Sequence, residues 1–189
     1  ELGMTNRKCR DFSEFRDIEI KNAYRDFVGS GILDEETMLK FVNAIGRDNA
    51  RFPMHWDDSD NAGFTTGTPW ISVNENYKKI NAAAQVNDPD SVFSYYKKLI
   101  ELRHQMEIIV YGVYKSKAIE HPDVFAYTRT LGDEKLFVVC NFREQEMDFT
   151  LEDGFTGDEK VLISNYDDVV KTENGIYLRP YEAKVFYRK

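Results

Sequence analysis

The spacing of apolar residues divides the chain into two parts. Up to about residue 106, apolar side chains recur every three or four positions in three segments, which predicts amphipathic helices joined by long polar loops. Ser13 and Asp34 are placed to cap the first two helices, and Gly46 is placed to end the second. Pro89 and Asp90 open the third. The expected apolar faces consist of Phe15, Ile18, Tyr24, Phe27 and Val28; of Met38, Phe41, Val42 and Ile45; and of Val92, Phe93, Tyr96, Leu99, Ile100 and Arg103.

From Ile108 onward the apolar period changes to two, which predicts β-strands. One of the expected strand pairs closes through a turn at Gly132 and Asp133. Short intervals between strands are typical of an antiparallel sheet or sandwich. We therefore expect an α+β fold, with helices and loops over residues 1–106 and an antiparallel β-domain over residues 107–189. The expected strand segments are 108–118, 123–142, 147–151, 160–166, 175–180 and 183–189.

Composition and charge exclude several classes of partner. The 189 residues carry a formal charge of −8, which argues against nucleic acid. No apolar run approaches the roughly 18 residues of a membrane span, and no signal-peptide core is present. Cys9 and Cys140 have no metal-ligand spacing, so we expect two reduced thiols in a cytoplasmic protein. Because the chain starts with Glu1 rather than Met, we expect it to begin inside a longer gene product.

Residues 46–89 form a long polar segment that also carries aromatic side chains, and such segments are usually functional. It begins with the sequence GRDNARFPMHWDD, in which Arg47 and Arg51 bracket Asp48. Gly46 and Pro53 argue against a continuous helix here. Two interpretations remain open. The arginines and the aspartate can form a network that pins the loop to its scaffold, or a guanidinium can be presented to hydroxyls, a carboxylate or a phosphate.

The remaining polar residues of this segment give no reaction by themselves. His55 lacks a second imidazole for a metal site, so we expect a hydrogen-bonded loop histidine. Trp56 can pack in the loop or cover the apolar face of a sugar. Asp57, Asp58 and Asp60 suit a turn better than a pair of catalytic carboxylates. The chain has no glycine-rich phosphate loop, no Ser-His-Asp order and no zinc spacing, so no metal or cofactor is expected.

Residues 46–103 closely resemble the α-glucosidase branch of the alpha-amylase family, whose members include oligo-1,6-glucosidases, dextran glucosidases and trehalose-6-phosphate hydrolases. The consensus of that branch here is Gly-Arg-Asp-Asn-Ala-Arg-Thr-Pro-Met-Gln-Trp. The resemblance extends over essentially the whole chain, from ELGMTN at residues 1–6 and FRDIEIKNAY at residues 15–24 to the closing LRPYEAKVFYRK. Phe52 stands where the family has Thr, and His55 where it has Gln, which leaves the substrate preference open.

The resemblance implies a fold. Family members have a (β/α)₈ barrel followed by an antiparallel β-domain, and barrel enzymes build their sites from loops after the strands. Residues 1–6 correspond to the exit from the eighth barrel strand. Residues 1–106 are then the loop and helices after that strand, a helical remnant of an incomplete catalytic domain. Residues 107–189 are the C-terminal β-sandwich. Apolar faces meant for the missing barrel would favour self-association.

The resemblance also implies a function. Family members are retaining glycosidases with an aspartate nucleophile and a glutamate acid/base, and a second aspartate holds the sugar hydroxyls. All three lie on strands that would precede Glu1. The chain is then expected to hold no catalytic residue and to be inactive alone, as the C-terminal part of an enzyme acting on short α-1,6-linked glucosides. There are two alternatives to this function. The parent enzyme can be a trehalose-6-phosphate hydrolase, or the chain can be a stand-alone carbohydrate-binding or structural module. Arg51 matches the arginine that binds the outer hydroxyls of the terminal glucose, while Arg47, Asp48, His55 and Trp56 are expected to support the loop.

Overall fold

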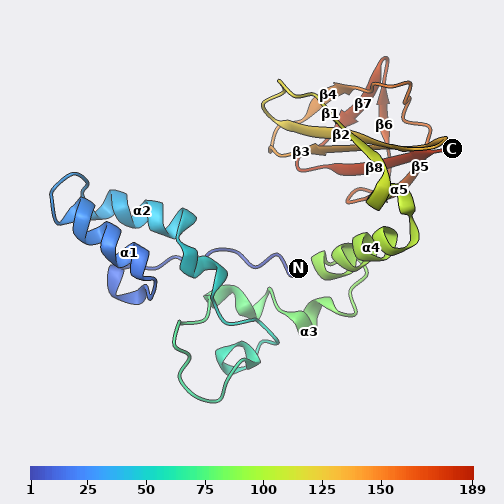
Figure 1. The fold of residues 1–189 in the computed structure, drawn as a ribbon. Coiled ribbons are helices and arrows are strands. Elements are labelled where there is room, and N and C mark those ends of the chain that lie inside the picture. The colour runs from blue at the N-terminus through green and yellow to red at the C-terminus, as the bar shows by residue number, and fades with distance from the viewer. The chain divides into compact units, whose positions relative to one another are not determined.

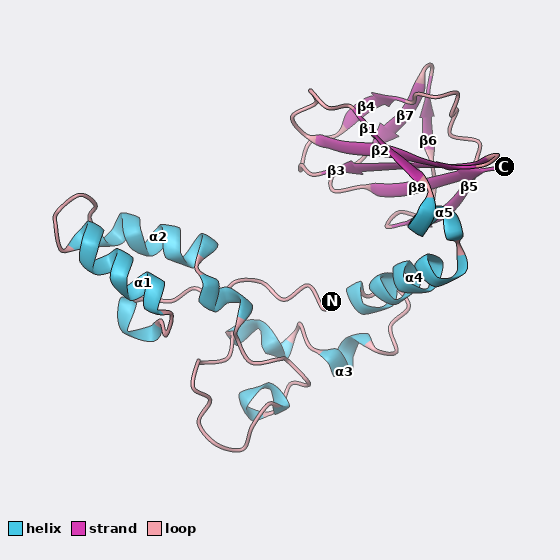
Figure 2. Ribbon diagram, in the orientation of Figure 1, coloured by secondary structure: helices cyan, strands magenta, loops and turns pink.

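The computed structural model describes residues 1–189, which divide into two compact units (Figures 1 and 2). The N-terminal unit, Glu1–Tyr96, contains helices and long loops. The C-terminal unit, Lys97–Lys189, contains all of the strands. The division between the units falls inside helix α4, Val92–Gln105. The predicted boundary between the helical part and the β-domain, after residue 106, lies just beyond the end of this helix.

The N-terminal unit is built on two short helices with well-defined caps. In α1, Ile18–Ala23, the cap is Asp17, whose carboxylate accepts the N–H of Glu19. The prediction that Ser13 starts this helix is wrong, because the backbone returns to an extended conformation at Phe15 and a new helix must begin. A 3-10 turn at Phe12–Glu14 precedes that break, and a π-helical turn at Tyr24–Val28 follows α1.

The second helix agrees with its prediction. Helix α2, Glu35–Ile45, begins after Asp34, whose carboxylate accepts the N–H of Thr37, and it ends at Gly46. Its buried side chains, Met38 and Val42, join those of the N-terminal segment and α1 in one core. The members of this core are Cys9, Phe15, Ile20, Met38 and Val42.

The long polar segment is ordered by short turns rather than by regular helices. Its 3-10 helices are Arg47–Ala50, Asp60–Gly63 and Glu75–Lys78, and α3 spans Ala82–Gln85. In α4 the hydroxyl of Ser91 accepts the N–H of Ser94, which places the cap one residue after the predicted Pro89 and Asp90. No side chain of α4 is buried, and most of its predicted apolar face is exposed, namely Val92, Tyr96, Leu99 and Ile100.

The C-terminal unit is a sandwich of two antiparallel sheets. The strand orders are β1-β2-β3-β8-β5 in one sheet and β4-β7-β6 in the other. Buried residues of both sheets, including Phe137 of β3 and Ile176 of β7, meet in one core, which confirms the predicted sandwich. The strands are β1 Val113–Lys117, β2 Val124–Leu131, β3 Glu134–Asn141, β4 Met147–Thr150, β5 Lys160–Ser164, β6 Val170–Thr172, β7 Gly175–Leu178 and β8 Ala183–Arg188.

Two details of this sandwich test the strand predictions. The β2–β3 hairpin closes between Leu131 and Glu134 as predicted, and Gly132 has a φ of +57°, which a glycine adopts without strain. The first predicted strand begins too early, because residues 107–111 form helix α5, Glu107–Tyr111. Ile108 of this helix is buried against the sheet with Leu136, a contact that the apolar run by itself could not distinguish from a strand.

Candidate functional site

The start of α1 and the 3-10 helix Arg47–Ala50 bring three charged side chains together. Asp48 lies in this turn, where its carbonyl oxygen accepts the N–H of Arg51 at 2.9 Å. Its carboxylate reaches the other segment: Oδ2 accepts the N–H of Arg16 at 2.6 Å and that of Asp17 at 3.0 Å. Asp48 is only 1% exposed, so this carboxylate joins the loop to the N-cap of α1 inside the unit.

Arg51 completes this cluster. Its Nη1 donates to Oδ2 of Asp17 at 2.7 Å and to Oδ1 of Asp48 at 3.1 Å. Burial lowers the pKa of Arg51, but hydrogen bonds to the two carboxylates outweigh that effect and raise it. Burial likewise raises the pKa of Asp17, and hydrogen bonds from Glu19 N–H and Arg51 more than reverse this. The arginine–aspartate network is therefore real, and Arg51 stays charged within it.

Arg47 differs from Arg51 in its surroundings. Its side chain is exposed and makes no hydrogen bond or ion pair within the chain, so the contacts that hold the loop come from Asp48 and Arg51. It lies beside a shallow apolar pocket of about 260 Å³ between α1 and α2, lined by Ile20, Phe41 and Ile45 among others.

His55 is fully buried and serves the loop. Its Nδ1 lies 2.8 Å from the carbonyl oxygen of Ile80, so Nδ1 carries the proton. Its own carbonyl accepts the N–H of Ala82 at 2.9 Å. His55 is thus the hydrogen-bonded loop histidine that the sequence predicts. The backbone of the neighbouring Trp56 is hydrogen-bonded to Ala62 and Ala83, but the residue is 54% exposed and does not belong to the core.

The acidic residues after Trp56 form a turn, as expected. Oδ1 of Asp57 accepts the N–H of Ser59 at 2.9 Å and also its hydroxyl. These two hydrogen bonds lower the pKa of Asp57. The next residues, Asn61, Ala62 and Gly63, all have positive φ angles, which makes a tight left-handed turn. Asp57 therefore stabilises this turn, as the sequence predicts.

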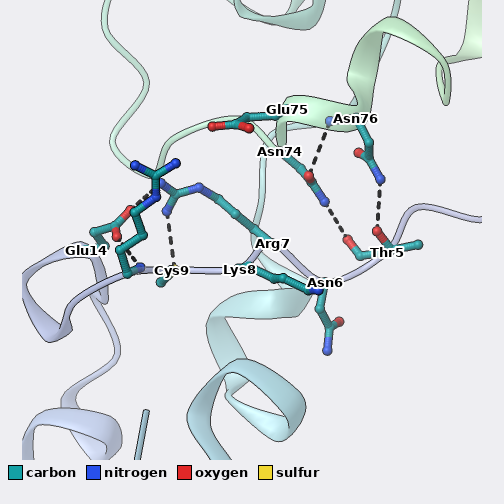
Figure 3. A pocket seen from close by; sticks show the side chains of 10 residues that line it. Thr5, Asn6, Arg7, Lys8, Cys9, Glu14, Asn74, Glu75 and Asn76 are labelled. Carbon is teal, nitrogen blue, oxygen red and sulfur yellow. Dashed lines mark hydrogen bonds and ion pairs between the residues drawn. The ribbon is translucent and has the colours of Figure 1, made fainter. Parts of the chain in front are cut away.

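The N-terminal unit also contains a polar cleft that the sequence does not predict. It has a volume of about 750 Å³ and lies between residues 5–10 and residues 74–76 (Figure 3). Most of its polar side chains already have partners: Asn74 donates to the carbonyl of Thr5 at 2.9 Å, and Arg7 donates to Glu14 and to the Sγ of Cys9. Only tertiary folding joins these two segments, so no local pattern could have indicated the cleft.

No group of three or more His, Cys, Asp or Glu side chains is arranged to hold a metal ion. No helix is long and apolar enough to cross a membrane.

Comparison with known proteins identifies the family. The sequence model of the alpha-amylase catalytic domain matches residues 1–112, and that of the SusG C-terminal domain of alpha-amylases matches residues 124–185. This chain belongs to the alpha-amylase family. The predicted combination of a catalytic-domain remnant and a C-terminal β-domain is thus confirmed, and the glycoside hydrolase relationship with it.

Individual relatives of this alpha-amylase family chain are glucosidases and related sugar enzymes. It is 50% identical over 188 residues to an oligo-1,6-glucosidase of Parageobacillus thermoglucosidasius, and 44% identical over 189 residues to a trehalose-6-phosphate hydrolase of Bacillus subtilis (strain 168). It superposes on the trehalose-6-phosphate hydrolase of Bacillus licheniformis with a TM-score of 0.88 and 43% identity, and on an isomaltulose synthase of Erwinia rhapontici with a TM-score of 0.90 and 42% identity.

The chain spans only part of these proteins. The alignments cover 98% of this chain but 34% of the Parageobacillus thermoglucosidasius enzyme and 33% of the Bacillus subtilis enzyme. Both structural superpositions likewise cover 98% of this chain and 34% of the solved chain. About two thirds of each relative therefore has no counterpart in these 189 residues.

Proposed function

We propose that this chain is the C-terminal part of a retaining α-glucosidase that removes glucose from the non-reducing end of short α-1,6-linked glucosides. Its role is to bind the sugar through Arg51. The observation that carries the proposal is a partly exposed guanidinium held by two buried carboxylates, in a chain half identical to an oligo-1,6-glucosidase. Nε and Nη2 of Arg51 make no hydrogen bond within the chain, so they remain for hydroxyl groups.

Bond cleavage belongs to another part of the enzyme in this proposal. A retaining glycosidase needs one carboxylate as nucleophile and a second carboxyl group as acid and base, both open to the sugar. The two carboxylates beside Arg51 do not meet this need, because the side chains of Asp17 and Asp48 are only 3% and 2% exposed and accept backbone N–H groups. The isolated chain is therefore inactive.

The test combines the isolated chain with a chimera. We expect no turnover of p-nitrophenyl α-glucoside by the chain alone, and turnover at a normal rate by that chain would refute the division of roles. A chimera in which the chain replaces the matched third of the Parageobacillus thermoglucosidasius enzyme should be active. Arg51→Ala in this chimera should lower kcat/KM by roughly 10- to 100-fold, the effect of one charge-assisted hydrogen bond.

The relatives also favour a second candidate, a trehalose-6-phosphate hydrolase, because the identity to the Bacillus subtilis enzyme is 44%. Release of glucose from isomaltose by the whole enzyme supports the first candidate, and release from trehalose 6-phosphate supports the second. A stand-alone carbohydrate-binding module would instead bind isomaltose tightly as the isolated chain, which calorimetry measures directly.

We also propose a cytoplasmic location and self-association of the isolated chain. Cys9 and Cys140 are both free thiols, which suits a reducing compartment. Self-association is supported by uncovered apolar side chains on α2, where Phe41 is 53% and Ile45 84% exposed. No nucleic acid, membrane or cofactor has a role in this proposal.

A further inference from the structure

The two walls of the polar cleft are fixed to each other by side-chain amides. Asn74 donates from Nδ2 to the carbonyl oxygen of Thr5 at 2.9 Å, and Asn76 donates from Nδ2 to the Thr5 hydroxyl, also at 2.9 Å (Figure 3). Nδ2 of Asn6 donates to two carbonyl oxygens near the end of α2, which ties one wall to the helix. The space of about 750 Å³ between the walls is therefore part of the folded unit.

The cleft carries more positive than negative side chains. Its lining includes three cations, Arg7, Lys8 and Arg10, and two carboxylates, Glu14 and Glu75. Three positive charges against two negative ones give the lining a formal charge of +1, whereas the whole chain carries −8. A local positive excess in an acidic protein attracts a small anion to this place and repels a cation.

Only one of the three cations is neutralised within the chain. Arg7 donates from Nη2 to Oε2 of Glu14 and from Nη1 to Sγ of Cys9. Burial raises the pKa of Glu14, but hydrogen bonds from the N–H of Arg10 and from the Arg7 side chain lower it overall, so this carboxylate stays charged. Glu14 therefore balances Arg7 and leaves the other two cations without a counter-charge.

The side chains of Lys8 and Arg10 are available to a ligand. Both are exposed and make no hydrogen bond or ion pair within the chain, although both line the cleft. Glu75 on the opposite wall is also exposed, so solvent screens its charge. An ammonium and a guanidinium beside one another suit the oxygen atoms of a phosphate or carboxylate group, to which both donate charge-assisted hydrogen bonds.

Asn76 adds a hydrogen-bond acceptor to the lining. Its Oδ1 is buried and has no hydrogen-bond partner within the chain, while its Nδ2 is bonded to Thr5. A buried polar atom without a partner is uncommon in a folded protein. A hydroxyl group of a ligand in the cleft would supply the missing donor.

We propose that the polar cleft binds a small oxyanion, with a phosphate or carboxylate group, through Lys8 and Arg10, and that Asn76 accepts a hydrogen bond from a hydroxyl group of the same ligand. The cleft is within the range of roughly 300–1,000 Å³ that small-molecule sites occupy. It shares no residue with the Arg51 cluster, so the proposal goes beyond the proposed function and does not depend on it.

Nuclear magnetic resonance of the ¹⁵N-labelled chain, at constant ionic strength, tests the oxyanion site. The probes are inorganic phosphate and gluconate, a carboxylate with several hydroxyl groups. Each should shift the backbone amide signals of Lys8 and Arg10 in a saturable way, with a Kd of roughly 1 mM, and sodium chloride should not. Binding of phosphate alone would assign the site to phosphate groups, and binding of gluconate alone would assign it to carboxylates.

Three variants separate the two cations from the overall charge. Lys8→Gln and Arg10→Gln should each fold, because neither side chain has a partner within the chain, and each should weaken phosphate binding about 10-fold or more. Lys79→Gln is the matched control. Lys79 is exposed, its side chain makes no hydrogen bond or ion pair, and it does not line the cleft, so the same loss of charge should leave the Kd unchanged.

The role of Asn76 is tested by comparing gluconate with acetate, which has no hydroxyl group. In the wild type, gluconate should bind more tightly than acetate. In Asn76→Ala this difference should disappear while acetate still binds, because Lys8 and Arg10 are unchanged. The acetate titration thus shows that the cleft is intact in the variant.

Three results would overturn the proposal. The absence of saturable shifts with both phosphate and gluconate would show that the cleft is no oxyanion site. Equal weakening of phosphate binding by Arg10→Gln and Lys79→Gln would assign the effect to overall charge. An advantage of gluconate over acetate that survives in Asn76→Ala would exclude Asn76 as the acceptor. None of these readouts depends on turnover, so failure of the proposed glucosidase function is a separate outcome.

Discussion

Arg51 donates from Nη1 to Oδ2 of Asp17, a residue 34 positions earlier in the chain, at 2.7 Å. This hydrogen bond joins the N-cap of α1 to the 3-10 turn of the GRDNAR segment. Asp48 lies between the two and bonds to both sides, to Arg51 through Oδ1 and to the backbone of Asp17 through Oδ2. Loop structure and proposed ligand binding therefore depend on the same three side chains.

Asp48→Ala should destabilise the N-terminal unit by about 3–5 kcal/mol, the usual cost of breaking a buried ion pair. The variant leaves the N–H groups of Arg16 and Asp17 without their acceptor. Urea unfolding followed by tryptophan fluorescence measures the effect selectively, because Trp56 and Trp70 both lie in this unit.

The matched control for this prediction is Asp58→Ala. Asp58 is an exposed carboxylate in the same loop and makes no hydrogen bond or ion pair within the chain. Its removal should change the free energy of unfolding by less than about 0.5 kcal/mol. Equal effects of the two variants would mean that Asp48 is not the residue that joins the loop to α1.

Gly63→Ala should cost about 2 kcal/mol. Its φ of +65° costs an alanine about 1 kcal/mol, and the new Cβ would lie 2.7 Å from the Asp57 carboxylate. Moving that carboxylate breaks its bonds to Ser59, which costs about 1 kcal/mol more. Gly31→Ala is the control, since Gly31 has a φ of +76° with no atom within 4 Å and should show only the first cost. Equal urea midpoints for the two variants would contradict the contact with Asp57.

Glu182→Gln should destabilise the sandwich by about 3 kcal/mol. Glu182 and Lys184 form a fully buried ion pair, and Arg179 also donates to Glu182 from Nε at 2.9 Å. The variant leaves the ammonium of Lys184 buried without its counter-charge. Hydrogen exchange of β8 measures the loss, and the double variant Glu182→Gln, Lys184→Met should recover most of it. A double variant as unstable as the single one would show that the pair itself is not the cause.

The stability of the sandwich should fall in acid. Burial raises the pKa of Glu182, but hydrogen bonds from Arg179 and Lys184 lower it overall to below its ordinary value. A lowered pKa in the folded state means that the stabilisation is complete above the unfolded pKa of about 4.3 and is lost as the pH falls through the folded value. Exchange rates in β8 should therefore be constant from pH 7 to about pH 5 after correction for intrinsic exchange, and rise below. The double variant without the pair should show a smaller rise.

The isolated chain should associate with itself as its concentration rises. Phe41 and Ile45 lie exposed on α2, and Phe41→Lys together with Ile45→Lys should shift the sedimentation coefficient toward that of a monomer. Ile119 is 75% exposed but lies in the other unit, so Ile119→Lys is the control and should change nothing. A wild-type chain that sediments as a monomer at all concentrations would refute the proposed association.

Local chemistry explains which elements the sequence predicts correctly. Asp34 and Gly46 delimit α2, and Gly132 turns the β2–β3 hairpin, because caps and tight turns depend on hydrogen bonds and φ angles within a few residues. The errors lie where a distant contact decides. Ile108 belongs to a helix because it packs on the sheet with Leu136. The first helix begins after Asp17 instead of Ser13 because the backbone is extended at Phe15, whose ring is buried in one core with Met38 and Val42 of α2.

The candidate site shows the same division. The sequence by itself determined the family resemblance, the two-part organisation and the choice of Arg51 as the residue to examine. Only the tertiary structure decided that Asp17 is its partner, that Arg47 has none within the chain, and that Asp48 is buried. The reason is physical: a short hydrogen bond between residues 34 positions apart depends on where two turns are held, and this is set by the packing of the whole unit.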